Sequence, residues 1–196
     1  MKMSIHEVYY DVNGVRLRAL HVGDSTAMPV IFLHGFPEYA DIWHSYLHDV
    51  AAAGCYAIAI EQRGYNLSDK PHGIDAYDVD QLAADVAIII EHELGQPAVV
   101  IGHDWGGAVA WHLAATQPQH VQHLVILNVP HPAVLAHNLQ QSPQQHRKSW
   151  YMYFFQVPVI PEMIFGGNRG WLMRQMAAAL IRDGQLGSLT KAAFSV

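Results

Sequence analysis

The sequence predicts an α/β fold in which a mostly parallel sheet carries helices on both faces. Short continuous apolar runs, typical of strands buried on both sides, alternate with longer stretches whose apolar residues recur at helical spacing. Glycine and polar residues follow several of these runs directly, and parallel sheets gather their chemistry at the carboxyl ends of their strands. With 196 residues, the chain is long enough to bury one packed core.

The individual elements follow from turn and breaker residues. Residues 6–22 predict a β-hairpin, because Asn13-Gly14 separates two alternating segments. Asp78 and Gln81 have the spacing of a capping box at the start of a helix. Further strands are expected at 29–33, 56–60, 97–103 and 124–128, with helices at about 39–53, 79–94 and 106–117.

The pattern changes after Pro132. The following residues are richer in polar side chains, helical stretches are expected at about 143–156 and 169–182, and no strand resumes. We therefore expect two parts. Residues 1–132 form the N-terminal part of an α/β core, and residues 133–196 form a partial helical cap inserted over the sheet.

Composition excludes several classes of function. The net charge is −6 and the 11 Lys and Arg residues form no basic stripe, which argues against a nucleic-acid partner. No apolar stretch approaches the roughly 20 residues that span a bilayer, and no signal-peptide core is evident, so we expect a cytoplasmic protein without a membrane partner. The 14 His residues are dispersed, without the spacing of a metal site. We expect no metal and no cofactor.

Residues 97–107 carry the chemistry. An apolar strand breaks sharply into a helix at Asp104, which stands between Gly102 and the pair Gly106-Gly107. This layout predicts a nucleophile elbow. The strand-to-helix turn is so tight that larger side chains two residues before or after the apex would collide, and the glycines avoid this collision. A carboxylate at the apex attacks sp3 carbon bearing a leaving group and becomes an ester, so we expect a small apolar substrate with an electrophilic carbon. Alternatively, Asp104 only caps the helix that follows.

Four motifs extend this pattern in chain order: His34-Gly35-Phe36-Pro37-Glu38, residues 63–71 (RGYNLSDKP), residues 102–107 (GHDWGG) and residues 128–132 (NVPHP). Together they resemble the epoxide hydrolase branch of the α/β-hydrolase superfamily, over roughly residues 5–167. The resemblance implies an incomplete α/β-hydrolase fold with the start of a helical cap.

The resemblance also implies roles for residues. Asp104 is the implied nucleophile that opens epoxides to vicinal diols through an alkyl-enzyme ester, and the backbone N–H groups of Phe36 and Trp105 form the implied oxyanion hole. His34 and Pro37 are expected in the substrate pocket.

Epoxide hydrolases use cap tyrosines to protonate the epoxide oxygen. Alignment on Phe155-Gln156 places Tyr151 at the first of these positions, with Tyr153 as the second choice and as a further pocket residue. Five aromatic residues in six are also typical of packing within a cap, which remains the alternative for Tyr151.

Two other functions remain open. Haloalkane and haloacid dehalogenases share the Asp elbow, although Phe36 stands where many haloalkane dehalogenases carry an Asn. The third possibility is a non-catalytic α/β module that binds an apolar ligand or is completed by a partner chain.

The second half of the reaction needs a His, oriented by an acid, to activate water. The resemblance implies that both come from strands beyond the cap, but no His follows His146, and only Glu162 and Asp183 are acidic after it. We therefore expect a truncated chain capable of single-turnover alkylation at most. A sheet without its closing strands is expected to expose an apolar edge that favours self-association.

Three polar residues near the motifs are expected to be structural. Strand alternation points His103 away from Asp104, towards a supporting role. Glu61 and Asp69 are expected to stabilise a strand-end turn, which Arg63 ties down.

Overall fold

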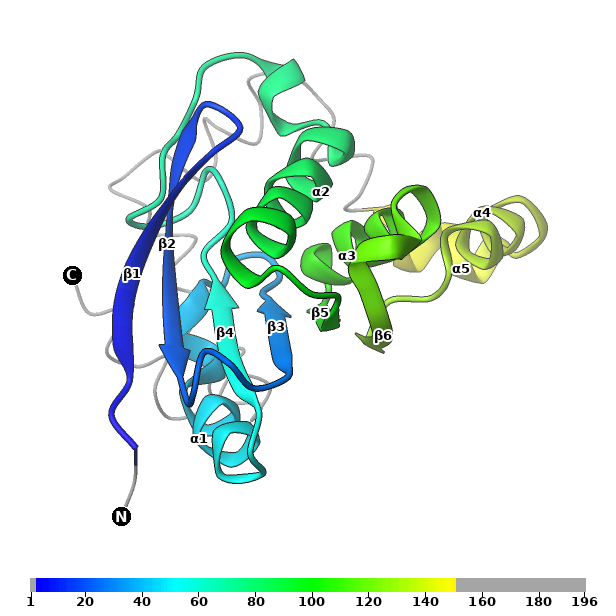
Figure 1. Cartoon of the computed structure of the whole chain (residues 1–196). Helices are drawn as coiled ribbons and strands as arrows, with labels where there is room; N and C mark the ends of the chain where they lie inside the picture. Colours follow the sequence, from blue (N-terminus) through cyan, green and yellow to red (C-terminus); the bar gives the residue numbers. More distant parts are fainter. Residues whose placement is uncertain (1–2, 151–196) are drawn as a thin grey trace, which may run out of the picture. The chain divides into compact units, whose positions relative to one another are not determined.

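The computed structural model describes residues 3–150, in which six strands form one sheet in the order β1-β2-β4-β3-β5-β6 (Figure 1). The strands are β1 (His6–Val12), β2 (Val15–Val22), β3 (Pro29–Leu33), β4 (Tyr56–Ile60), β5 (Ala98–His103) and β6 (Val121–Leu127). Strands β4, β3, β5 and β6 are parallel, whereas β1 and β2 are antiparallel at one side. The predicted hairpin and the mostly parallel sheet are confirmed, and β6 begins at Val121, before the predicted residue 124.

Each predicted helix of the core is present, with local differences. The helical segments of the core are η1 (Ala40–Trp43), α1 (His44–Ala52), η2 (Ile74–Tyr77), α2 (Val79–Ile88), η3 (Ile89–Leu94), α3 (Trp105–Thr116) and η4 (Pro118–His120). The helix expected at 39–53 is a 3-10 turn followed by an α-helix, and the one expected at 79–94 ends as a π-helix closed by Gly95 in the left-handed region.

The capping box expected at α2 is only half present. The Asp78 side chain accepts a hydrogen bond from the Asp80 N–H at 3.2 Å, so Asp78 is the N-cap. Gln81 accepts instead from the side-chain amide of Asn13 at 3.1 Å. A long-range contact with the β1–β2 hairpin therefore replaces the local one, because tertiary packing brings the turn beside α2.

Helices cover both faces of the sheet. Side chains alternate along a strand, so Ile31 and Leu33 of β3 join the apolar cluster that includes residues of α2 and α3. The intervening Val30 and Phe32 pack in a second cluster with residues of η1 and α1, where the rings of Phe32 and Trp43 lie 5.0 Å apart. The continuous apolar run of β3 is thus buried on both sides, as the sequence predicts.

The chain divides into two compact units, residues 1–130 and 131–196. The boundary predicted from the sequence, after Pro132, lies two residues beyond the observed boundary after Pro130. The described part of the second unit holds α4 (Pro132–Gln141) and α5 (Pro143–Lys148).

Helix α4 was not expected. It begins because His131 caps it, accepting the Ala133 N–H at Nδ1 over 3.2 Å, and because Pro132 suits the first helical position. Helix α5 lies at the start of the stretch predicted for 143–156. The rest of that stretch, the helix expected at 169–182, Tyr151 and Tyr153 lie outside the described residues, and the assignment of 133–196 as a cap stays a prediction.

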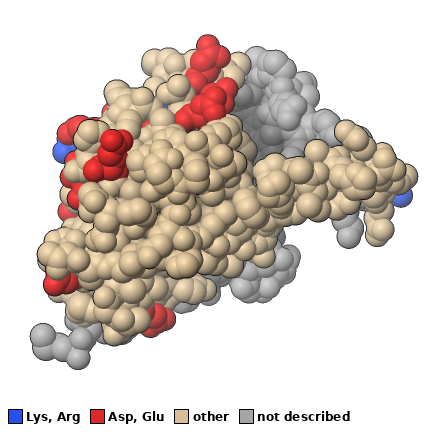
Figure 2. Space-filling view, turned by 45° about the vertical axis from the view of Figure 1, so that its right-hand side comes forward, with Lys and Arg blue, Asp and Glu red and all other residues tan. Residues whose placement is uncertain are grey.

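Strand β6 is one edge of the sheet in the part of the chain that the structure describes. From Leu124 to Leu127 its side chains alternate between partly buried and exposed, and Val125 and Leu127 are 41% and 40% exposed. On the face shown in Figure 2, acidic side chains gather in small groups and most of the surface is uncharged. None of the helices within residues 3–150 has the length and apolar character to cross a bilayer.

Candidate active site

Three loops meet at the carboxyl ends of neighbouring strands. Strand β3 lies between β4 and β5 and is parallel to both, so the segments that follow these strands emerge at one edge of the sheet. They are residues 34–38 after β3, residues 61–70 after β4, and Asp104 after β5. Residues 34–38 and Asp104 lie within predicted motifs. Residues 61–70 overlap the predicted motif 63–71 and begin two residues before it.

Asp104 occupies a sharp bend between β5 and α3. Its φ of 50° and ψ of −117° are rare for an L-residue and represent stored backbone strain. It stands at the N-cap position of α3, yet its side chain makes no capping hydrogen bond. Instead, Oδ1 accepts the backbone N–H of Phe36 at 2.9 Å. The capping alternative is therefore wrong, because the carboxylate is held towards the loop after β3.

Glycines make this bend possible. A Cβ on Gly102 would lie 2.5 Å from the carbonyl oxygen of Gly106, and one on Gly106 would collide with the carbonyl oxygens of Leu33 and His34. Gly35 passes so close to the bend that a Cβ there would lie 2.5 Å from the Cβ of Asp104. The predicted need for small residues around the apex is confirmed, and Gly107 is the least constrained of the group.

His34 is buried and makes hydrogen bonds that fix the loop after β3. Its ring is fully buried, with Nε2 accepting the Gln62 N–H at 3.1 Å and Nδ1 3.0 Å from the carbonyl oxygen of Gly35. These contacts place the ring proton on Nδ1. Burial lowers the pKa of His34 to about 4, so the ring is neutral at pH 7. The His34 and Tyr65 rings meet in an edge-to-face contact with centroids 4.7 Å apart.

Glu38 joins the loop after β3 to His103, the residue before Asp104. Its buried carboxylate lies 3.0 Å from Nδ1 of His103 and 3.4 Å from the Gly35 nitrogen. The hydrogen bond to Glu38 raises the pKa of His103 against the opposing effect of burial, and the charge of Asp104 adds to the rise. Nε2 of His103 lies 3.3 Å from the Asn128 side-chain amide. His103 thus has the supporting role that strand alternation predicts.

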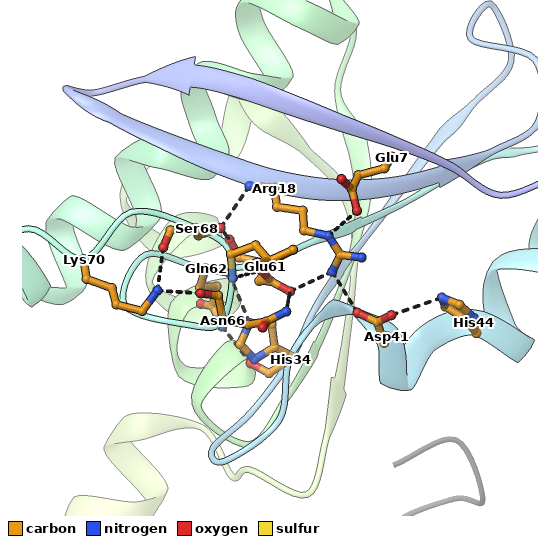
Figure 3. Close-up of polar contacts among 11 residues, drawn as sticks. Glu7, Arg18, His34, Asp41, His44, Glu61, Gln62, Asn66, Ser68 and Lys70 are labelled. Atoms are coloured by element: carbon orange, nitrogen blue, oxygen red, sulfur yellow. Dashed lines mark hydrogen bonds and ion pairs between the residues drawn. The ribbon is translucent and has the colours of Figure 1, made fainter. Parts of the chain in front are cut away.

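A partly buried ion cluster centred on Arg18 lies next to the loop after β4 (Figure 3). The Arg18 guanidinium, on β2, donates to Glu7 at 2.7 Å, Asp41 at 2.8 Å and Glu61 at 2.9 Å. Arg18 is 7% exposed and Glu61 is fully buried. A buried charge needs partners of this kind to remain ionised.

Glu61 also fixes the shape of the loop. It accepts the Leu67 N–H at 2.7 Å and the Asn66 amide at 3.1 Å, and its carbonyl oxygen accepts the Ser68 hydroxyl at 2.6 Å (Figure 3). The predicted structural role of Glu61 is confirmed. These bonds hold the segment that presents Tyr65.

Arg63 ties the same loop to α2, as predicted. Its guanidinium forms a bidentate pair with Asp85, with 2.7 Å between Nε and Oδ2, and Nη1 donates to the Ala76 carbonyl oxygen at 2.8 Å. Asp69 closes the far end of the loop by accepting the Arg16 N–H at 2.8 Å. The loop is therefore joined to both α2 and β2.

A pocket of about 340 Å³ lies next to Phe36 and Trp105, two residues that adjoin Asp104. Its walls come from the loops after β3 and β4, from η2 and α2, and from the first residue of α3. The lining residues are Phe36, Arg63, Gly64, Tyr65, Tyr77, Leu82 and Trp105. Phe36 and Trp105 are each 42% exposed although they are large apolar residues. The pocket is thus largely aromatic, and two of its lining residues, Phe36 and Trp105, adjoin Asp104.

Only some of the predicted site residues line the pocket. Phe36 and Trp105 flank Asp104 and line the pocket, whereas His34 lies beneath the loop and Pro37 is half-buried within it. The roles of His34 and Pro37 as pocket residues stay predictions, as does the N–H of Trp105 as an oxyanion donor. Tyr151 and Tyr153 lie outside the described residues.

Sequence reasoning gave no role to three residues that the structure brings to the site. Glu38 and Tyr65 stand within predicted motifs, and their position there was the available signal. Tyr77 lies outside every motif, and only the folded loop places its ring in the pocket wall.

Comparisons with known proteins agree with this geometry. A family model described as alpha/beta hydrolase fold matches residues 28–168. Among relatives, the AB hydrolase superfamily protein YfhM of Bacillus subtilis is 44% identical over 154 residues, covering 79% of this chain and 54% of the relative. Epoxide hydrolase 1 of Caenorhabditis elegans is 40% identical over 156 residues, covering 80% of this chain and 38% of the relative.

Solved structures give the same result. An epoxide hydrolase from Bacillus megaterium superposes with a TM-score of 0.86 at 30% identity, covering 95% of this chain and 65% of that one. A mutant of an epoxide hydrolase from the same organism, complexed with its product (R)-3-[1]naphthyloxy-propane-1,2-diol, gives the same values. The chain spans 38% and 54% of the length of the two sequence relatives and 65% of these structures.

Proposed function

The chain belongs to the α/β-hydrolase family, and on this basis we propose that the protein opens epoxides with Asp104 as its nucleophile, through an ester that water cleaves to a vicinal diol. One observation carries the proposal. The carboxylate sits at a strained bend, outside the capping network of α3, with one oxygen held by a backbone N–H. A serine at this position would instead suit acyl transfer.

In the first step, Oδ2 of Asp104 forms a bond to an epoxide carbon while the ring C–O bond breaks and its electron pair stays on oxygen. The hydrogen bond from Phe36 to Oδ1 leaves Oδ2 available for this attack. The new alkoxide takes a proton from an acid. Tyr151, with Tyr153 as the second choice, is our predicted donor.

In the second step, a base takes a proton from water while the water oxygen adds to Cγ of the Asp104 ester, and negative charge develops on the ester's carbonyl oxygen. The resemblance implies a His as this base, and no His follows His146 in the sequence. The carbonyl oxygen of the ester is Oδ1, which already accepts the Phe36 N–H at 2.9 Å. The Trp105 N–H is the proposed second donor. Preorganised donors of this kind contribute about 3–4 kcal/mol each in related hydrolases. The bond between Cγ and Oδ2 then breaks, so Oδ2 takes one proton and leaves with the diol, while the water oxygen completes the restored carboxylate. The second proton of the water returns to the acid that protonated the epoxide oxygen.

The relatives favour epoxide over halide. The Caenorhabditis elegans relative and the superposed Bacillus megaterium proteins are epoxide hydrolases, and one of the latter is bound to a vicinal diol product. Phe36 provides no side-chain N–H for a halide, unlike the Asn of many haloalkane dehalogenases.

Intact-protein and peptide mass spectrometry after incubation with styrene oxide tests the first step without depending on the second. We expect one added styrene oxide, mapped to Asp104. The Asp104→Asn variant keeps the size of the side chain but removes the nucleophile, so the adduct on this peptide should disappear.

Incubation with a bromoalkane is the matched comparison. Bromide release with an adduct on Asp104, and no adduct from the epoxide, would establish the dehalogenase alternative. No adduct from either compound would leave a ligand-binding module.

A further inference from the structure

The hairpin turn between β1 and β2 carries a reactive dipeptide that the proposed function does not use. Asn13 and Gly14 form this turn with positive φ values of 46° and 73°, and both residues are exposed. The Asn13 side chain nevertheless reaches α2, where it contacts Asp85 across 72 positions of the chain. We propose that Asn13 is a site of hydrolytic deamidation, and that its conversion to a carboxylate detaches the hairpin from α2 and loosens the loop after β4.

The reaction needs only water and the neighbouring backbone. The Gly14 nitrogen gives up its proton to solvent and bonds to Cγ of Asn13, while the bond between Cγ and Nδ2 breaks and Nδ2 takes a proton to leave as ammonia. Water then opens the resulting cyclic imide. Cleavage between the nitrogen and Cγ gives aspartate, and cleavage between the nitrogen and the main-chain carbonyl carbon gives isoaspartate.

Gly14 favours ring closure because it has no side chain to obstruct its nitrogen. A Cβ built on Gly14 meets nothing within 4 Å, so the turn also has room for the imide ring. Asn66 is the contrast within this chain, because it too has a positive φ, of 37°, but is followed by Leu67. The Leu67 side chain hinders attack by its own nitrogen, and the Leu67 N–H already donates to Glu61 at 2.7 Å.

The amide of Asn13 acts as a hydrogen-bond donor to α2. Its Nδ2 lies 3.1 Å from Oε1 of Gln81 and 3.1 Å from Oδ1 of Asp85. An ionised Asp85 can only accept hydrogen bonds. A carboxylate in place of the amide would therefore meet a second carboxylate at hydrogen-bond distance, and like charges this close repel each other.

Asp85 transmits this repulsion to the loop after β4. Its side chain is 3% exposed, so water screens the charges poorly, and it forms the bidentate pair with Arg63. Burial raises the pKa of Asp85, while the hydrogen bonds and charge of Arg63 and the hydrogen bond from Asn13 lower it. Deamidation removes the contact from Asn13 and adds a negative charge. The anchor of the loop on α2 is thereby weakened.

Isoaspartate would also change the backbone of the turn. It adds a carbon atom to the main chain between Val12 and Val15, which pair directly across the turn. Both valines are buried in the apolar cluster beneath α2 and α3. A two-residue turn of this kind matches the twist of its strands, and a longer main chain disturbs that match. Either product therefore weakens the attachment of the hairpin.

The first measurement is the deamidation rate of each Asn in the folded chain. The protein is incubated at pH 8, and peptide mass spectrometry follows the replacement of amide by carboxyl groups. Asn13 should react at least about tenfold faster than Asn66, a difference of about 1.4 kcal/mol in activation free energy. In Asn13→Gln the longer side chain disfavours ring closure, so reaction at this position should fall to the rate of Asn66. Equal rates at Asn13 and Asn66 in the wild-type protein would overturn the site.

The second measurement is backbone hydrogen exchange of residues 61–70 in Asn13→Asp. Exchange should be several-fold faster than in wild type, because the loop has lost part of its anchor. Asn138→Asp is the matched control, since it makes the same chemical change at an exposed residue of α4. It should leave the exchange of residues 61–70 unchanged. If Asn13→Asp exchanges no faster than this control, the coupling is wrong.

A third measurement covers a variant that does not fold. Deamidated wild-type protein carries an additional negative charge, so anion-exchange chromatography separates it from unreacted protein after incubation. The fraction that peptide mapping shows to be modified at Asn13 alone is then compared with the unreacted fraction. Faster exchange of residues 61–70 in the deamidated fraction supports the coupling, and equal exchange refutes it.

Discussion

Asp104 illustrates how neighbouring residues set the chemistry of one side chain. Its positive φ is tolerated because Gly102 and Gly106 let β5 and α3 approach each other closely, and Gly35 lets the loop after β3 pass against its side chain. The glycines beside the apex follow from local spacing and could be predicted. The hydrogen bond from Phe36 spans 68 positions in the chain and depends on the sheet order.

The buried His34 ring makes stability depend on pH. Its folded pKa of about 4 lies below the ordinary value of 6.5, because burial disfavours the charged ring. Such a group contributes stability that is fully present above pH 6.5 and is lost as pH falls through 4. This lowering of the pKa corresponds to at most about 3 kcal/mol of unfolding free energy.

We therefore predict that His34→Gln weakens the pH dependence of folding. The Gln side chain offers an acceptor for the Gln62 N–H but does not titrate. Urea unfolding at pH 7 and pH 4 should show a smaller loss of unfolding free energy for the variant than for wild type, by about 1–3 kcal/mol. An unchanged loss would show that other groups dominate acid sensitivity in this range.

At the scale of elements, the loop after β4 is joined to α2 by one buried ion pair. Arg63 and Asp85 are each at most 3% exposed as side chains. Removing one partner leaves the other charge buried and uncompensated, which costs about 3–5 kcal/mol. The pair also holds the polar part of the pocket wall.

Asp85→Ala is therefore expected to lower the unfolding free energy by about 3–5 kcal/mol, measured by urea unfolding at pH 7. Asp80→Ala on the same helix is the control, because Asp80 is 73% exposed and pairs with His112 at the surface, where such pairs contribute at most about 1 kcal/mol. The double variant Arg63→Met, Asp85→Leu should regain much of the loss. Equal effects of the two single substitutions would contradict a dominant buried pair.

At the scale of the whole molecule, β6 is an edge strand in the described residues and carries two exposed apolar side chains, Val125 and Leu127. Edge strands of this kind present unpaired backbone groups to other chains. Self-association through β6 stays a prediction.

Sedimentation velocity over a range of protein concentrations tests it. Val125→Lys places a charge on the edge strand and should shift the protein towards monomer. Val134→Lys introduces the same charge at a side chain of α4 that is 51% exposed and should leave association unchanged. If the wild-type protein stays monomeric at every concentration, the prediction of self-association through β6 is wrong.

The amino-acid sequence by itself determined the features that depend on local spacing. These are the strands and helices of residues 6–117, the hairpin turn at Asn13-Gly14, and a carboxylate at a glycine-lined apex. It missed α4, because the cap made by His131 has no strong sequence signature.

Only the tertiary structure decided which distant residues meet. Glu38 reaches His103 across 65 positions, Arg63 reaches Asp85 across 22, and Tyr77 enters the pocket wall, because strand order and helix packing bring their elements together. Spacing along a chain specifies local conformation, but such contacts arise from burying two faces of one sheet at once. The glycine-lined bend at Asp104 was therefore visible in the sequence, and the contacts that Glu38, Arg63 and Tyr77 make around it were not.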